Sequence, residues 1–149
     1  MNLTEASKED IPDILLLYQR AIVPIWTKIG RDYSLKRIRQ NLIEHLGGLN
    51  HYHHVVQDED GALVAYRAWQ RHLDATSEDV IAHLHILLVD PSFQRRGIAA
   101  KLLQDFEEHA RELECTKILF DVAIGNPAHA FYEKLGYRCW SAYMQKRLS

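Results

Sequence analysis

Apolar residues recur along the first part of the chain at the spacing of amphipathic helices. In residues 3–22, apolar side chains lie three and four positions apart from Ile14 onward, which predicts a helix. Pro24 is expected to end this helix, because proline cannot continue a helix interior. The residues that follow, 25–33, are expected to form a loop that carries exposed aromatic side chains.

A second helix is predicted over residues 35–46, where the sequence reads "LKRIRQNLIEHL". Ser34 precedes this run and is a suitable N-cap, because a serine hydroxyl can accept a hydrogen bond from a free backbone N–H of the first turn. Gly47 and Gly48 follow it and are expected to end the helix.

The second half of the chain alternates between runs typical of strands and runs typical of helices. Residues 51–72 contain two β-rich runs on either side of "DEDG", which predicts a hairpin. Residues 80–89 are almost continuously apolar, so we expect a central strand that is covered on both faces. The remaining predicted elements are a helix from about Ala99 to Leu113, a strand over 116–124, a short helix within 125–137 and a last strand over 138–148.

The order of these elements predicts one domain over residues 1–149 of the α/β (α+β) class. The strand–helix–strand succession in the second half should form a right-handed crossover between two parallel strands. The hairpin of the first half should make the sheet mixed, with helices on both faces. We find no internal repeat, low-complexity tract or linker that would indicate a second domain.

Composition and charge narrow the class of protein. The net charge of −2 gives no support for nucleic-acid binding, although "SLKRIRQ" and "QRRG" are local basic segments. The two cysteines, Cys115 and Cys139, match no metal-ligand spacing, and two free thiols in a reducing compartment are the simpler expectation. The polar N-terminus does not resemble a signal peptide, and no apolar run is long enough to cross a membrane, so a cytoplasmic protein is expected.

A short basic turn, "VDPSFQRRGIA", separates the strand 80–89 from the long helix that follows. A glycine at the start of a helix lets the backbone approach a ligand, and the first helical turn leaves N–H donors unpaired. Those donors and the helix dipole favour a phosphate, and Arg95 and Arg96 add positive charge beside them. The turn therefore indicates a pyrophosphate site, or alternatively a solvated connection of no special function.

The segment "LLVDPSFQRRGIAAKLL" resembles the acetyl-CoA-binding signature of the GNAT superfamily of N-acetyltransferases. That signature reads Q/R-x-x-G-x-G/A after an apolar strand, and Gln94, Gly97 and Ala99 occupy its three defining positions. About thirty residues later, "GNPAHAFYEKLGY" resembles the second landmark of the family, a helix that begins near an asparagine and carries a tyrosine. The resemblance implies a mostly antiparallel sheet in which one parallel pair of strands splays apart.

The resemblance also implies where acetyl-CoA would bind. The backbone of the strand would pair with the pantetheine arm as an added strand does. The amides that follow would hold the pyrophosphate, and the asparagine would lie near the thiol end. The residues expected to contact the cosubstrate are Leu87, Leu88, Val89, Gln94, Arg95, Arg96, Gly97, Ile98, Ala99, Ala100 and Asn126.

Tyr132 is implied by the resemblance to be the general acid that protonates the departing CoA thiolate. The step from Asn126 to Tyr132 is six residues, whereas many relatives have seven, and a branch with "NPAH-FY" looks similar. A half-buried packing residue is the alternative interpretation of this tyrosine.

The sequence offers two candidates for the general base that an ammonium acceptor requires. Asp121 lies in the predicted strand 116–124, at a position that resembles the catalytic carboxylate of the branch that acetylates protein N-termini. His83 lies where the histone-modifying branch carries a glutamate, and the two-residue period places it on one strand face with His85 and Leu87. The alternatives are an ion-pair or cap role for Asp121, solvent-facing histidines, and a water chain that carries the proton. No third ligand completes the His-x-His pair, so no metal is expected.

These observations predict an N-acetyltransferase that uses acetyl-CoA and a primary amine in one ternary complex. A CoA-binding regulatory module without turnover is the alternative. The amine, a small molecule or a peptide, would bind against the N-terminal half, where Trp26 and Tyr33 could line a wall and Asp32 could attract a cation. Trp26 could equally pack in the core. An exposed edge strand or the last strand could support a homodimer, and we expect neither nucleic acid nor membrane as a partner.

Overall fold

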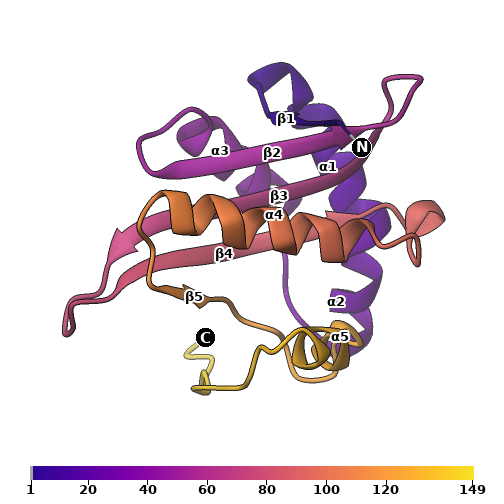
Figure 1. Ribbon diagram of the computed structural model, residues 1–149. Coiled ribbons are helices and arrows are strands. Elements are labelled where there is room, and N and C mark those ends of the chain that lie inside the picture. The colour runs from indigo at the N-terminus through magenta and orange to yellow at the C-terminus, as the bar shows by residue number, and fades with distance from the viewer. Residues whose placement is uncertain (1) are drawn as a thin grey trace.

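The computed structural model describes residues 2–149 and is built on a five-stranded sheet in the order β1-β2-β3-β4-β5 (Figure 1). Neighbouring strands run antiparallel except for β4 and β5, which are parallel. The predicted fold class, a mixed and mostly antiparallel sheet with one parallel pair, is therefore confirmed. The strands are β1 Asn2–Glu5, β2 His51–Gln57, β3 Leu63–Leu73, β4 Val80–Val89 and β5 Lys117–Leu119.

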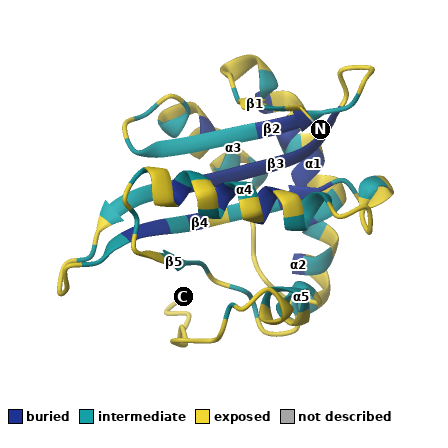
Figure 2. Cartoon of the chain, viewed as in Figure 1, coloured by how far each residue is buried: buried dark blue, intermediate teal, exposed yellow. Residues whose placement is uncertain are grey.

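Helices cover both faces of the sheet. In Figure 1, α4 crosses the front of the strands, while α1 and α3 lie behind them. Two apolar cores result, because each sheet face packs against its own helices: Leu17 and Tyr66 belong to the core under α1, and Trp69 and Phe106 to the core under α4. Figure 2 shows the buried residues along the central strands. The helices are α1 Ile11–Ala21, α2 Val23–Ile29, α3 Leu35–His45, α4 Ile98–Glu112 and α5 Ala128–Lys134.

The region predicted to be a loop after Pro24 is a helix instead. α2 begins at Val23, so Pro24 lies in its first turn, where the missing N–H costs no hydrogen bond. Trp26 is buried in the core between this helix and α1, as the packing alternative predicted. The predicted N-cap is confirmed for α3, where the Ser34 hydroxyl accepts from the Arg37 backbone N–H at 3.1 Å.

The first strand was missed in the sequence, one later strand was predicted too long and the last predicted strand does not form. Residues 2–5 pair antiparallel with β2, although their polar pattern gave no strand signal. β5 pairs with β4 over only three residues, and residues 120–124 leave the sheet. The last strand predicted over 138–148 does not form: within residues 2–149, no backbone hydrogen bond joins that segment to a strand, and Tyr143 and Met144 point to solvent.

A β-bulge in β4 changes which residues share a face. Trp69 pairs with Leu84 and Ala68 pairs with Ile86, so His85 is an extra residue without an opposite partner. His83 and His85, which precede the shift, lie on the same side, with their rings 4.7 Å apart. Leu87 packs in the core under α4, on the other side of the sheet. The prediction that all three residues share one face is therefore wrong, because a bulge breaks the two-residue period.

Candidate active site

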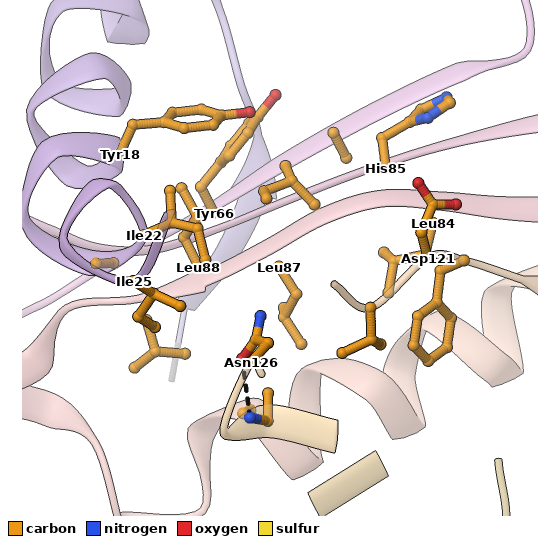
Figure 3. Close-up of a pocket in the computed structure, with 18 of the residues that line it drawn as sticks. Tyr18, Ile22, Ile25, Tyr66, Leu84, His85, Leu87, Leu88, Asp121 and Asn126 are labelled. Carbon is orange, nitrogen blue, oxygen red and sulfur yellow. Dashed lines mark hydrogen bonds between the residues drawn. The ribbon is translucent and has the colours of Figure 1, made fainter. Parts of the chain in front are cut away.

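A cavity of about 960 Å³ opens between β4 and β5 and extends under the N-terminal helices (Figure 3). It exists because the two parallel strands pair only from Ile81 to His83 on β4. Beyond His83, in the described part of the chain, no strand pairs with the edge of β4 that faces β5. Leu87 and Leu88 of β4 line the cavity opposite Val122, which follows β5.

The basic turn forms one end of this cavity. Gly97 has φ 75° and Arg95 has φ 65°, so the backbone twists through the left-handed region twice before α4 begins. The first hydrogen bond of the helix runs from the Lys101 N–H to the Gly97 carbonyl at 3.1 Å. Within residues 2–149, the backbone N–H groups of residues 95–100 donate no hydrogen bond, so they are available to a ligand.

The turn is anchored on its N-terminal side by Asp90. The Asp90 carboxylate accepts from the Ser92 backbone N–H at 2.9 Å and pairs with Arg20 of α1 at 2.7 Å. These hydrogen bonds and the ion pair with Arg20 hold the pKa of Asp90 below its usual range, although its partial burial acts in the opposite direction. Asp90 therefore ties the turn to a helix of the opposite half of the cavity.

Almost all the residues predicted to contact acetyl-CoA line the cavity. The exception is Arg96, whose guanidinium lies over the Phe93 ring at 4.8 Å. Asn126 reaches the cavity from the start of α5, and its side-chain oxygen accepts from the Ala128 N–H at 2.9 Å. In Figure 3 the amide nitrogen of Asn126 points away from this bond and into the cavity.

Tyr132 also lines the cavity, on α5. Its ring packs edge-on against Phe120 at 4.7 Å, so the side chain is held between the end of β5 and the helix. Burial raises the pKa of the Tyr132 hydroxyl. A phenol in this position stays protonated near neutral pH and can donate a proton into the cavity.

The two histidines that the sequence placed together stay adjacent, but only one of them lines the cavity. His85 lines the cavity, whereas His83 lies behind it and is not among the residues of the wall. Asp121 lies in the segment that leaves β5, and its negative charge raises the pKa of both histidines, against the larger effect of burial. Figure 3 shows the Asp121 carboxylate close to His85 at the border between the two halves of the cavity.

Most of the wall opposite the basic turn was not predicted from the sequence, because its residues come from separate helices and strands and carry no local motif. His53 Nδ1 lies 2.6 Å from the Tyr66 hydroxyl, and His85 Nε2 lies 3.3 Å from Gln70 Oε1. The signal that could have found them is the period-two pattern of histidines in "HYHH" and "HLH". Trp26 lines this wall, but Tyr33 and Asp32 do not.

Three imidazoles at the cavity, those of His51, His53 and His85, have lowered pKa values. Burial lowers the pKa of His53 to about 4 and that of His85 to about 4, and charge repulsion from neighbouring histidines adds to the effect. Burial also lowers the pKa of His51, whose ring stacks on His45 at 4.6 Å. At neutral pH these side chains therefore offer hydrogen bonds without positive charge.

Residues 2–149 contain no group of three or more histidine, cysteine, aspartate or glutamate side chains arranged to hold a metal ion. None of the helices in this range has the length and apolar character needed to cross a bilayer.

Known proteins match this chain over most of its length. A family model described as the acetyltransferase (GNAT) family matches residues 13–137. Aminoglycoside N(6')-acetyltransferase type 1 of Acinetobacter baumannii is 28% identical over 138 residues, which cover 92% of this chain and 90% of that protein. The solved tetramutant of the BH1408 protein from Bacillus halodurans has a TM-score of 0.81 at 21% identity, covering 99% of this chain and 100% of its own. The aminoglycoside antibiotic 6'-N-acetyltransferase AAC(6')-IG from Acinetobacter haemolyticus has a TM-score of 0.78 at 21% identity, with both chains fully covered.

Proposed function

Because this chain belongs to the GNAT family of acetyltransferases, we propose that it transfers the acetyl group of acetyl-CoA to a primary amine of a small molecule. Donor and acceptor would occupy the cavity together, and the amine would attack the thioester carbonyl directly. The observation that carries the proposal is that one cavity is lined by the turn at the start of α4, by Tyr132 and by Asp121.

The residues present fit the donor. Six successive N–H groups, from Arg95 to Ala100, donate no hydrogen bond within the described residues and would bind a ligand that carries negative charge, as a pyrophosphate does. The unpaired edge of β4 beyond His83 offers the hydrogen bonds of an added strand to an extended chain such as pantetheine. The backbone N–H of Leu88 or Val89 would stabilise the negative oxygen that develops during attack.

Two groups of this chain would handle the protons. Asp121 would hold the incoming ammonium and, directly or through water, accept its proton. His83 does not line the cavity and would take part only through a neighbouring group, such as His85, whose ring lies 4.7 Å away. Tyr132 would deliver a proton to the sulfur as the carbon–sulfur bond breaks and the carbon–nitrogen bond forms.

A small-molecule acceptor is supported by the similarity to an aminoglycoside acetyltransferase, whose named substrate is a small molecule. That similarity extends over most of both chains. A CoA-binding module without turnover remains the alternative function for the same fold.

The test is amine-dependent release of free thiol from acetyl-CoA by the purified full chain, with a panel of primary amines. We expect saturable release with at least one amine. The Asp121→Asn variant should lower kcat/KM by about 100-fold, as expected for loss of a general base. The matched control is Asp60→Asn in the β2–β3 turn, which changes the charge equally, away from the cavity. Tight CoA binding without thiol release for any amine would refute the transferase proposal and favour the module.

A further inference from the structure

The half of the cavity that would receive the acceptor carries almost no negative charge. We call its wall the acceptor wall, defined as the cavity residues of α1 to α3, β2 and β3 with the segments that directly follow them. Among the residues within 2–149 that line the whole cavity, Asp121 is the sole carboxylate, and it lies at the border with β5. The acceptor wall consists of Tyr18, Ala21, Ile22, Ile25, Trp26, Arg31, Ile38, Asn41, Leu42, His45, His51, His53, Tyr66, Ala68 and Gln70.

The single charged residue of the acceptor wall is a cation. Arg31 lies over the Trp26 ring at 5.1 Å, and no carboxylate within the described residues forms a salt bridge with it. Asp32 is next to it in sequence but does not line the cavity, and its carboxylate contacts Arg147 of the C-terminal segment. The prediction that Asp32 attracts a cationic acceptor is therefore not supported by its position.

The helix that follows adds to this positive charge. The α3 segment carries Lys36, Arg37 and Arg39 against the lone acid Glu44, and all four are exposed. A second ammonium group that enters beside Arg31 would be repelled rather than paired. The histidines of the wall would not offset this repulsion, because a histidine side chain supplies no negative charge.

The helices of the acceptor wall contribute mainly apolar and aromatic side chains, while its uncharged polar groups come from Asn41, Gln70 and the histidines. Trp26 and Leu42 are less than a tenth exposed, and Tyr18 packs at 6.1 Å from Trp26. Figure 3 shows Ile22 and Ile25 on the same side of the cavity as Tyr18. A hydrocarbon or aromatic body would gain burial against these helices, whereas a body with several ammonium groups would lose its water with no carboxylate on the acceptor wall to pair with them.

We propose that the acceptor carries a single amine on an apolar or aromatic body, and that the site discriminates against polycationic amines. Asp121 would pair with that one ammonium, and Arg31 would exclude further cations. The inference rests on the proposed acetyl transfer. It predicts an acceptor that differs from the aminoglycosides after which the relatives are named.

The test compares tryptamine, an aromatic monoamine, with kanamycin, a polycationic aminoglycoside. Binding of each to the full chain saturated with CoA is measured by calorimetry, and kcat/KM is measured by thiol release from acetyl-CoA. We expect tryptamine to exceed kanamycin by about tenfold or more in both measurements. Arg31→Glu should increase kanamycin affinity by about tenfold. Arg111→Glu, which makes the same charge change on α4 at the other face of the sheet, should alter it by less than about threefold.

The outcomes separate this inference from the transfer itself. Tighter binding and faster turnover of kanamycin by the wild type would overturn the inference while supporting the transferase. Tryptamine binding that exceeds kanamycin binding without any thiol release would support the inference and refute the transfer. An Arg31→Glu variant that gains no kanamycin affinity over the Arg111→Glu control would overturn the role of Arg31.

Discussion

His53 and Tyr66 meet across β2 and β3, with His53 Nδ1 only 2.6 Å from the Tyr66 hydroxyl. Burial raises the pKa of Tyr66 well above its usual value, so its hydroxyl keeps its proton. A neutral imidazole can accept that proton in a hydrogen bond, whereas a charged imidazole cannot. The contact therefore favours an uncharged His53 in the wall of the cavity.

This arrangement predicts a loss of stability at mildly acidic pH. The pKa of His53 is about 4 in the folded chain and about 6.5 when unfolded, so the unfolded state binds more protons between these values. The free energy of unfolding should fall as the pH falls from about 6.5 to 4. The slope from His53 should stay below the limit of ~1.4 kcal/mol per pH unit, because the ring keeps some solvent contact. Urea unfolding at pH 7 and pH 5 should show a smaller difference for His53→Gln than for the wild type, and an equal difference would contradict this assignment.

Tyr132→Phe should lower turnover more than cosubstrate affinity. The substitution removes the only group proposed to protonate the thiolate but keeps the ring packed on Phe120. We expect kcat to fall by about 100-fold with little change in the KM for acetyl-CoA. Tyr137→Phe is a suitable control, since that hydroxyl donates to Glu107 at 3.1 Å and does not line the cavity. Unchanged turnover in Tyr132→Phe would remove Tyr132 from the mechanism.

Gly97→Glu should abolish acetyl-CoA binding. A side chain at Gly97 would start in open space beside the unpaired N–H groups, where it would place a negative charge at the proposed phosphate site. Gly61→Glu in the β2–β3 turn is a matched control, because Gly61 has φ 81° against 75° at Gly97 and is equally unobstructed. Both variants should lose about 1–2 kcal/mol of stability from the left-handed backbone. Calorimetry with CoA should detect no binding for Gly97→Glu alone, and retained affinity would refute the pyrophosphate site.

Asp105→Ala should destabilise the fold through Arg67. The Arg67 side chain is 1% exposed and donates to the Asp105 carboxylate at 2.8 Å and to the Leu102 carbonyl at 2.9 Å. Removing the carboxylate leaves a buried cation, at a cost of about 2 kcal/mol, less than for a fully buried pair because Asp105 is half exposed. Chemical denaturation measures this loss, and the double variant Arg67→Met, Asp105→Ala should recover most of it. Failure of the double variant to recover would show that the ion pair is not the cause.

The sequence predicted best where a local pattern determines the structure. The turn around Gly97 was identified from a glycine, a helix start and a strand end, all within eleven residues. The Ser34 cap and the hairpin were likewise local signals, and the structure confirms both. Pro24 led to the wrong prediction of a loop over residues 25–33, because a proline can end one helix and can also lie in the first turn of the next.

What the sequence could not predict depends on pairing between distant segments. The bulge at His85 is visible only in the register of β4 against β3, and it places Leu87 on the other side of the sheet from His83 and His85. The length of β5 depends on where it diverges from β4, which no residue type within 116–124 marks. The acceptor wall was missed for the same reason, because its residues come from five separate elements.

The two parts of the cavity come from two consecutive parts of the sequence. The acceptor wall comes from residues up to Gln70, whereas the turn, the edge of β4 and α5 come from residue 80 onward. Substitutions that accumulate in the first part could therefore change the amine that is accepted while the donor site stays intact. A gene exchange that joins the first half of one relative to the second half of another would keep both sites whole, provided that its junction falls in the exposed loop at residues 74–79. New acceptor specificities in this protein could thus arise by recombination at one exposed loop.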